Sequence, residues 1–473
     1  MMKALRLISV FLLLSGLAGP AAAQAPALAT FAVGNTTVTA SALAGNLTTI
    51  WELAWGPDNF LWMTERGGRL SRVNPATGQV LPVLTIPDVT ETNESGLLGM
   101  VVMDSCPMCT PPFSTYWVFV VYTYTDQGTL KEKLVRYSYR SPGGLFGTPL
   151  VLLDNIPAST AHSGSRLLLL ADRTLLMSTG DEQQPSQAQN LNSLNGKIMR
   201  LNLDGTVPAN NPTPGSLVYT FGHRNPQGLV RLPNGAVYSS EQGLNNDDEI
   251  NKIEAGRNYG WPNVEGYCNL PAEATFCAAN NVREPLTAWT PPIAPAGLTY
   301  YNHPAIPGWQ GSLLLAVLQG HQLTQLTLDA AGLSIPTRTD FLTGFGRLRA
   351  ICVSPQGRVY VGTSNRDGRG TPAATDDRIL VLENRAYVAT ATQPVGGELA
   401  FDVLPNPARQ QATVRLAVPA TQLRVLDLAG RPVRRAVPTG PSAVLDLTGL
   451  RPGLYLVQAE GPAGRATRRL VVE

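Results

Sequence analysis

The sequence predicts an all-β protein: a six-bladed β-propeller followed by a small immunoglobulin-like β-sandwich. Three observations lead to this prediction. The 473 residues include 45 Gly and 38 Pro spread along the chain, which favours many turns and short strands over long helices. One strand–break–strand pattern recurs six times, and short alternating strands follow it. Charged residues make up 15% and hydrophobic residues 44%, which excludes a disordered chain or a coiled coil.

The N-terminus, residues 1–23, is typical of a secretory signal peptide. Lys3 and Arg6 provide a basic start, residues 7–18 form an apolar run, and small residues precede the expected cleavage site. A buried helix is the alternative interpretation. Because the apolar run is too short for a membrane span, we expect no transmembrane helix once the signal is removed.

Six copies of one pattern recur along residues 50–385, within a propeller domain expected at residues 27–385. Each copy has a turn rich in Pro, Asp, Asn or Gly, an apolar strand, a polar break and a second strand. The paired segments are 56–62 and 69–73, 117–120 and 134–137, 170–175 and 197–201, 232–238 and 249–253, 309–315 and 323–326, and 354–361 and 378–382. Since one copy cannot bury both its faces alone, we expect the copies to pack round a central channel as blades. A β-sandwich with long insertions is the alternative.

The C-terminal part reads as a linker, residues 386–398, and a small β-sandwich, residues 399–473. Turn residues separate five short alternating runs at 413–416, 423–428, 443–447, 454–457 and 469–472. This part contains ten Arg, no Lys and five acidic residues, whereas the rest of the chain is slightly acidic. The overall net charge of +2 argues against a nucleic-acid partner.

The five cysteines suit an exported protein with a few disulfides. Cys106 and Cys109 lie in one loop and Cys268 and Cys277 bracket another, so each pair can close a disulfide. The first pair could instead bind a metal or act in redox chemistry. Cys352 lies in an apolar run and is expected to be a buried free thiol.

The tail resembles the type A sorting domain of the type IX secretion system. The matching segments are Leu404-Pro405-Asn406-Pro407, residues 426–431, residues 445–450 and residues 451–457. The resemblance implies Sec-dependent export and then passage across an outer membrane, with the type IX translocon and a sortase as partners. The expected location is therefore the cell surface or the medium.

The main domain resembles the soluble pyrroloquinoline-quinone (PQQ) sugar dehydrogenases of the glucose/sorbosone dehydrogenase family. The matching segments, in order, are residues 62–70, 96–99, 162–167, 196–205, 222–228, 240–243, 247–251 and 258–262. The family fold is a six-bladed propeller, in agreement with the count of repeats. The resemblance implies oxidation of the C1 hydroxyl of an aldose to a lactone, with hydride transfer to PQQ, Ca²⁺ as a second cofactor and an external electron acceptor.

This chemistry needs a base with a pKa near neutrality, which favours His. The chain has four His, at 162, 223, 303 and 321. The resemblance makes His162 the base, whereas His223 is expected to be a structural hydrogen-bonding residue. It also implies that Arg224 and Asn225 hold the quinone oxygens, with Arg224 stabilising the negative charge that develops there.

The remaining implied ligands serve the cofactors. Arg347 and Arg349 alternate along an expected strand and can face the same channel. The resemblance implies that they bind the PQQ carboxylates, and a solvated strand edge is the alternative. The backbone carbonyls of Gly243 and Leu244 match the ligands of the active-site Ca²⁺. A second Ca²⁺ is expected near Asp248, Glu249 and Tyr259, where a solvated acidic turn is the alternative.

Several positions depart from the family pattern. Ala161 precedes the expected base, where glucose-oxidising members carry Asp. Glu94 and Glu182 stand where those members have Gln near substrate and cofactor, and they could hold a cation or be protonated when buried. Gln319 stands where a Lys contacts PQQ, and Thr290 replaces an aromatic residue. Two other functions therefore stay open: a Ca²⁺-dependent lactonase and a non-catalytic propeller that binds a glycan or protein.

Overall fold

The computed structural model describes residues 25–105, 114–141, 143–388, 401–416, 420–427, 431–438, 440–461 and 464–473. The chain divides into two compact units, Met1–Ala386 and Tyr387–Glu473. The expected signal peptide, the Cys106–Cys109 pair and most of the expected linker lie outside the described residues.

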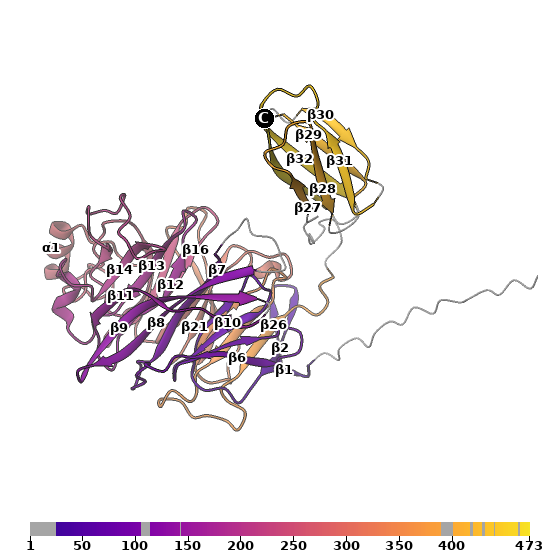
Figure 1. The fold of residues 1–473 in the computed structure, drawn as a ribbon. Helices are drawn as coiled ribbons and strands as arrows, with labels where there is room; N and C mark the ends of the chain where they lie inside the picture. Colours follow the sequence, from indigo (N-terminus) through magenta and orange to yellow (C-terminus); the bar gives the residue numbers. More distant parts are fainter. Residues whose placement is uncertain are drawn as a thin grey trace, which may run out of the picture. The chain divides into compact units, whose positions relative to one another are not determined.

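In the described part of unit 1, six antiparallel sheets follow one another along the chain (Figure 1). The first sheet contains β3 (Ile50–Trp55), β4 (Leu61–Glu65), β5 (Arg69–Val73) and β6 (Val80–Thr85). The second contains β7 (Leu97–Asp104), β8 (Ser114–Asp126), β9 (Thr129–Ser141), β10 (Leu145–Phe146) and β11 (Leu150–Pro157). The third contains β12 (Leu167–Leu169), β13 (Thr174–Thr179), β14 (Lys197–Asn202) and β15 (Val218–Phe221).

The other three sheets of unit 1 have the same plan. The fourth contains β16 (Pro226–Arg231), β17 (Val237–Glu241), β18 (Asp248–Ile253) and β19 (Thr287–Trp289). The fifth contains β20 (Pro295–Tyr301), β21 (Ser312–Val317), β22 (Gln322–Thr327) and β23 (Thr337–Phe341). The sixth contains β24 (Leu348–Val353), β25 (Val359–Thr363) and β26 (Ile379–Glu383), together with β2 (Thr36–Ala44) and β1 (Ala27–Val33).

The first strands of the six sheets form a closed ring in the described part of unit 1. Contacts run in order through β3, β7, β12, β16, β20 and β24, and β24 touches β3 again. The sixth sheet combines both ends of the unit, because β2 pairs antiparallel with β26. Each predicted strand pair overlaps the second and third strands of a sheet. The pattern missed the first and fourth strands.

The cores lie between neighbouring sheets and follow from the two-residue period of a strand. In β21, Leu313 and Leu315 pack with side chains of the fourth sheet. Leu314, between them, packs with the sixth sheet. Each such fully buried leucine contributes about 1.5–3 kcal/mol to stability. Both faces of a middle strand are therefore apolar, which is why the repeats are visible in the sequence.

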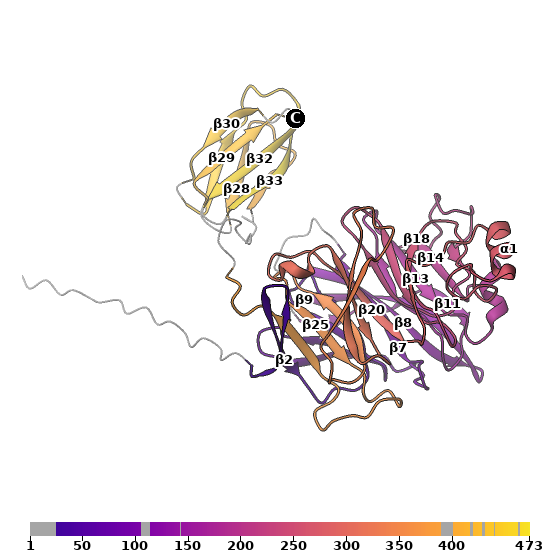
Figure 2. The ribbon, with the colours of Figure 1, turned by 180° about the vertical axis from the view of Figure 1, so that it is seen from behind.

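Three short helical segments join the strands: η1 (Pro185–Gln189), α1 (Pro271–Asn280) and η2 (Pro307–Trp309). Helix α1 starts at Pro271, which needs no N–H partner at the first turn, and the Glu273 side chain accepts the N–H of Leu270 at 3.1 Å. It ends at Asn281, which is left-handed with φ 54°. Helix α1 lies at the periphery of unit 1 in both ribbon views (Figure 2).

Unit 2 has two antiparallel sheets around one core. One contains β27 (Phe401–Leu404), β28 (Gln411–Leu416) and β31 (Ser442–Asp446). The other contains β30 (Pro432–Ala436), β29 (Gln422–Leu426), β32 (Gly453–Gly461) and β33 (Gly464–Val472). All five predicted runs are strands here. The prediction missed β27 and β30, and in β30 Pro432, Arg434 and Arg435 interrupt the apolar pattern.

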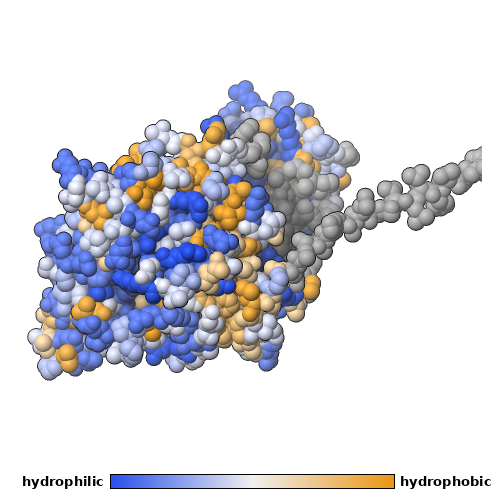
Figure 3. Space-filling view, turned by 90° about the horizontal axis from the view of Figure 1, so that it is seen from below, coloured by the Kyte–Doolittle hydropathy of each residue, from blue (hydrophilic) through white to orange (hydrophobic). Residues whose placement is uncertain are grey.

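No helix among the described residues is long and apolar enough to cross a membrane. On the face seen in Figure 3, hydrophobic side chains form separate groups among hydrophilic ones. That distribution gives this face no broad apolar band.

Candidate active site

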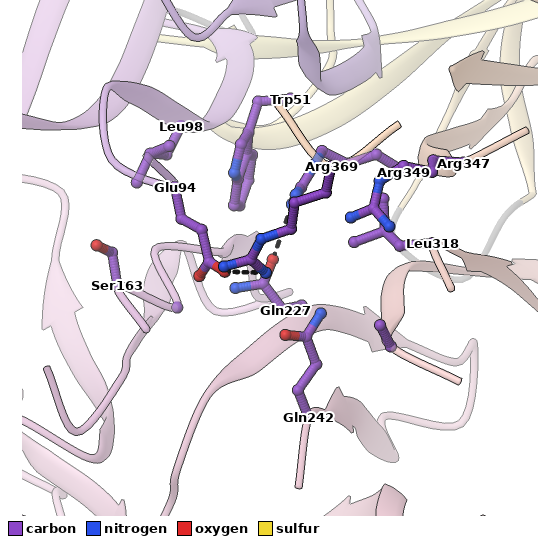
Figure 4. A pocket seen from close by; sticks show the side chains of 12 residues that line it. Trp51, Glu94, Leu98, Ser163, Gln227, Gln242, Leu318, Arg347, Arg349 and Arg369 are labelled. Carbon is purple, nitrogen blue, oxygen red and sulfur yellow. Dashed lines mark hydrogen bonds and ion pairs between the residues drawn. The ribbon is translucent and has the colours of Figure 1, made fainter. Parts of the chain in front are cut away.

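A cavity lies where loops and strand ends from all six sheets converge (Figure 4). Most of its lining is polar or charged. The lining residues are Trp51, Glu94, Leu98, Ser163, Gly164, Gln227, Gln242, Ala294, Leu318, Arg347, Arg349 and Arg369. Since each sheet contributes at least one residue, the ring itself brings together side chains that are distant in the sequence.

The loop of His162 stands at the edge of this cavity in a strained backbone conformation, with φ 66°. It packs directly on the chain after β13. A Cβ at Gly180 would lie 1.5 Å from the carbonyl oxygen of His162, so only glycine permits this approach. The backbone N–H of His162 donates to Oε2 of Glu94 at 3.2 Å.

The two ring nitrogens of His162 face partners of opposite kind. Nδ1 lies 2.8 Å from Oδ1 of Asp181, and Nε2 lies 3.1 Å from Nη2 of Arg224. A carboxylate only accepts and a guanidinium only donates a hydrogen bond. Nδ1 therefore carries the proton, and the lone pair of Nε2 points toward Arg224, which is the tautomer a general base needs.

Asp181 is the partner that the sequence analysis missed. It is 1% exposed, and its Oδ2 accepts the indole N–H of Trp261 at 2.9 Å. Its own N–H donates to the carbonyl of Arg224 at 2.7 Å, so it is fixed from both ends. The sequence feature that could have identified Asp181 is its position directly after a buried strand and a glycine.

Arg224 connects the imidazole to the turn at Gly243. Its Nη1 donates to the carbonyl oxygens of Gly243 at 2.6 Å and Gln242 at 3.1 Å. Burial lowers the pKa of Arg224, while nearby carboxylates oppose that effect.

Asn225 is buried and its amide is used within the protein, donating to Oε1 of Gln242 at 3.1 Å. As expected, His223 has structural partners, Glu241 and Thr220, each at 2.8 Å.

Arginine side chains of the sixth sheet form a cationic side of the cavity (Figure 4). Nε of Arg347 lies 2.7 Å from Oδ2 of Asp367. Arg349 is 6% exposed, and within the described chain its guanidinium bonds neutral groups, Oε1 of Gln227 at 3.0 Å and Oγ of Ser364 at 3.4 Å. Burial lowers the pKa of Arg349 to about 10. A buried cation without a direct anionic partner is suited to bind an anion.

Two of the residues that depart from the family pattern, Gln319 and Glu182, do not line this cavity. Gln319 is exposed, and its backbone N–H donates to Ile293 at 2.9 Å. Glu182 is 2% exposed, with Oε2 accepting the N–H of Ser159 at 2.6 Å and Oε1 without a hydrogen bond in the described chain. Burial, and then the neighbouring Glu132, raises the pKa of Glu182 well above its usual value.

The expected metal ligands lie around a second cavity, lined in part by Gly243, Glu249 and Tyr259. Asp248 and Glu249 are neighbours in β18, so their side chains point to opposite faces. Asp248 accepts three backbone N–H groups, from Gly243, Ile293 and Ala294 at 2.8, 2.6 and 2.7 Å. Burial raises the pKa of Glu249 well above its usual value.

The Leu244 side chain is 49% exposed, which leaves its backbone as the expected ligand. Within the residues that the structure describes, no group of three or more His, Cys, Asp or Glu side chains forms a metal cluster. Carbonyl oxygens and one or two carboxylates remain the available donor set, and these hard ligands suit Ca²⁺.

The cysteines behave as predicted where the structure describes them. Cys268 and Cys277 form a disulfide that ties the start of α1 to its last turn. Cys352 is a buried free thiol, and burial raises its pKa.

The fold and the cavity define a class of protein: an all-β ring of six sheets with a carboxylate-bound histidine beside a cavity lined by three arginines. The sequence pattern of the Glucose / Sorbosone dehydrogenase family matches residues 47–380. The chain therefore belongs to this family and is, as the sequence predicts, an oxidoreductase. The pattern of a secretion system C-terminal sorting domain matches residues 402–473.

Curated relatives include quinoprotein glucose dehydrogenase B of Acinetobacter calcoaceticus, 37% identical over 273 residues. That match spans 50% of this chain and 56% of the length of the Acinetobacter protein. The aldose sugar dehydrogenase of Escherichia coli K12 is 28% identical over 350 residues, covering 70% of this chain and 91% of that protein.

Solved structures agree with the fold. The PQQ-bound aldose sugar dehydrogenase of Streptomyces coelicolor is 31% identical, with a TM-score of 0.63, covering 73% of this chain and 98% of that one. The apo form of the E. coli aldose sugar dehydrogenase is 26% identical, with a TM-score of 0.64, covering 74% and 100%.

Proposed function

We propose that this protein is an exported PQQ- and Ca²⁺-dependent dehydrogenase that oxidises the C1 hydroxyl of an aldose to the lactone. The observation that carries the proposal is the pair of His162 and Asp181 at the edge of a cavity with three arginines. Bound PQQ would supply the carbonyl that accepts the C1 hydride. An external acceptor would then reoxidise the cofactor.

In this mechanism Nε2 of His162 takes the C1 hydroxyl proton. Asp181, which accepts the Nδ1 proton, stabilises the imidazolium that forms. Arg224 stands beside the same nitrogen at 3.1 Å and would stabilise negative charge on a neighbouring oxygen. Arg347 and Arg349 would hold the carboxylates of PQQ, because Arg349 is buried against neutral partners.

The backbone carbonyls of Gly243 and Leu244 would hold the active-site Ca²⁺. Arg224 already uses one lone pair of the Gly243 carbonyl, and a second remains. Glu249 and Tyr259 would serve a second Ca²⁺, with Asp248 fixing the backbone around it rather than binding directly.

Several structural assignments belong to the same proposal. The six sheets would be the blades of a six-bladed propeller in residues 27–385, and residues 399–473 an immunoglobulin-like sandwich after the linker 386–398. A Sec signal in residues 1–23 and passage through the type IX translocon would then lead to the cell surface or the medium.

The lactonase alternative depends on a metal held by Glu94 and Glu182. Their partners differ: Glu94 forms an ion pair with Arg369, whereas Glu182 accepts the backbone N–H of Ser159. Because the two carboxylates bind different groups, this arrangement argues against one metal shared between them.

Reconstitution with PQQ and Ca²⁺ tests the function, with His162→Asn as the variant and His321→Asn as the control. Both histidines have positive φ, 66° and 55°, which Asn tolerates better than Ala. We expect sugar to bleach the quinone absorbance of the wild type and the control. His162→Asn should bind PQQ but lose most turnover. Equal turnover in both variants would remove His162 from the mechanism, and lactone hydrolysis with metal alone would support the lactonase.

A further inference from the structure

Arg369 and Glu94 form an ion pair between two cavity-lining residues. Nη1 of Arg369 lies 2.6 Å from Oε1 of Glu94 (Figure 4). Arg369 follows β25 of the sixth sheet, whereas Glu94 precedes β7 of the second, so the pair links two sheets that are distant in the sequence.

The charges of the cavity distinguish Arg369 from the other two arginines. Arg347 is engaged by Asp367, and Arg349 is buried among neutral groups. The Arg369 side chain is 53% exposed, and an ion pair this accessible adds little stability. Arg369 can therefore exchange Glu94 for another anion at small cost.

The backbone of Arg369 is nevertheless held next to Arg347. Its N–H donates at 2.9 Å to Oδ1 of Asp367, whose Oδ2 binds Arg347. One carboxylate thus fixes both arginines at the same side of the cavity, while the long side chain of Arg369 stays accessible. Gln319, which stands where the family pattern has a Lys, is outside the lining.

We propose that Arg369 is a third carboxylate-binding cation of the cavity, and that Glu94 holds its guanidinium until an anionic cofactor replaces Glu94. This inference rests on the proposed function. When Arg369 leaves, Oε1 of Glu94 becomes available beside the His162 loop, to which Oε2 already bonds at 3.2 Å. A sugar hydroxyl can then donate to this oxygen, so the cofactor binds before the sugar.

Equilibrium titration with PQQ in the presence of Ca²⁺, read by absorbance and intrinsic fluorescence, tests the inference. Arg369→Gln should raise the dissociation constant roughly 10- to 100-fold, the usual cost of one charge-assisted contact. Glu94→Gln should lower it several-fold, because the competing carboxylate is gone. The matched control is Arg366→Gln in the same loop, whose guanidinium donates to the Asp376 carbonyl and which should bind like the wild type.

The outcomes separate the two proposals. If the wild type binds PQQ and Arg369→Gln binds equally well, Arg369 is not a ligand and only this inference fails. If Glu94→Gln binds more weakly than the wild type, Glu94 assists rather than competes, and the exchange is wrong. If the wild type binds no PQQ, the proposed function fails as well. Unchanged thermal unfolding of each variant excludes a folding defect.

Discussion

Asp181 fixes the orientation of His162: Oδ1 of the buried carboxylate lies 2.8 Å from Nδ1 of the imidazole. The carboxylate is itself held by the Trp261 indole and by the N–H of Gln183, both at 2.9 Å. The lone pair of Nε2 is thereby directed to the side where Arg224 stands, so the base is positioned before any substrate arrives.

Asp181→Asn should abolish this arrangement. An amide can donate to Nδ1 and favour the wrong tautomer, so we expect kcat to fall by roughly 10²–10⁴-fold, the range of general-base catalysis. PQQ affinity should stay the same, because Asp181 does not line the cofactor cavity. Steady-state kinetics beside a PQQ titration measures both, with exposed Asp154→Asn as the control. An unchanged kcat would contradict the role of Asp181.

Glu52 and Arg166 form a buried ion pair beneath the cavity. Arg166 also lies 4.3 Å over the Trp51 ring and donates to the Gln227 carbonyl at 2.8 Å. Glu52→Ala should destabilise unit 1 by about 3–5 kcal/mol, because it leaves a buried charge uncompensated.

Urea unfolding followed by tryptophan fluorescence measures this effect, since all seven Trp lie between residues 51 and 309. The double variant Glu52→Leu/Arg166→Met should recover most of the loss. A double variant as unstable as Glu52→Ala would mean that packing, rather than the unpaired charge, is responsible.

Glu132 gives unit 1 a pH-dependent stability. Its side chain is fully buried, Oε1 accepts the Ser165 hydroxyl at 2.7 Å, and Oε2 has no hydrogen bond in the described chain. Burial raises its pKa from the ordinary 4.5 to about 8. Because the pKa of Glu132 is higher in the folded than in the unfolded chain, the protonated side chain favours the folded state. This contribution to the free energy of unfolding is complete below pH 4.5 and is lost as the pH rises to about 8.

Glu132→Gln keeps the shape and the contact with Ser165 but removes the titration. The variant should match the wild type near pH 4.5 and be more stable at pH 8, by urea unfolding at both values. The neighbouring Glu182, whose pKa is also raised, should retain a weaker dependence. If the variant is less stable than the wild type at pH 8, ionisation of Glu132 does not destabilise unit 1, and the prediction is wrong.

The disulfide between Cys268 and Cys277 should matter locally. Closing so short a loop contributes roughly 2–4 kcal/mol. Helix α1 is a peripheral insertion between β18 and β19. The double variant Cys268→Ser/Cys277→Ser should therefore lose stability in residues 267–284 and not in the ring of sheets. Hydrogen exchange should increase there and stay unchanged in β18. Faster exchange throughout unit 1 would contradict this local effect.

The propeller and the sorting domain could be predicted because their signals repeat. Middle strands such as β21 are apolar on both faces, so each appears as a continuous apolar run next to turn residues. His162 precedes β12, and Arg347 and Arg349 lie at the start of β24, so all three belong to the first strands that meet in the ring. Asp181 and Arg369 are single polar residues in loops, and their importance depends on which loops the ring brings together. Neither spacing nor composition contains that information.

Glu182 and Gln319 show the opposite case. Matching by position suggests cofactor contacts, yet one side chain is buried away from the cavity and the other is exposed. A loop can keep its place in the sequence while its side chain rotates to another neighbour. Alignment therefore identifies the loop, and geometry identifies the residue.

The pairing of β2 with β26 joins the two ends of unit 1 like a clasp. Until the residues of β26, near 383, have been synthesised, β2 in the N-terminal hairpin has no strand to pair with. The ring of sheets stays open at that point. Deleting that hairpin would leave β26 as a bare edge, ready to recruit a strand from another molecule. Because this last sheet also supplies Arg347, Arg349 and Arg369, the cavity first exists when the ring has closed.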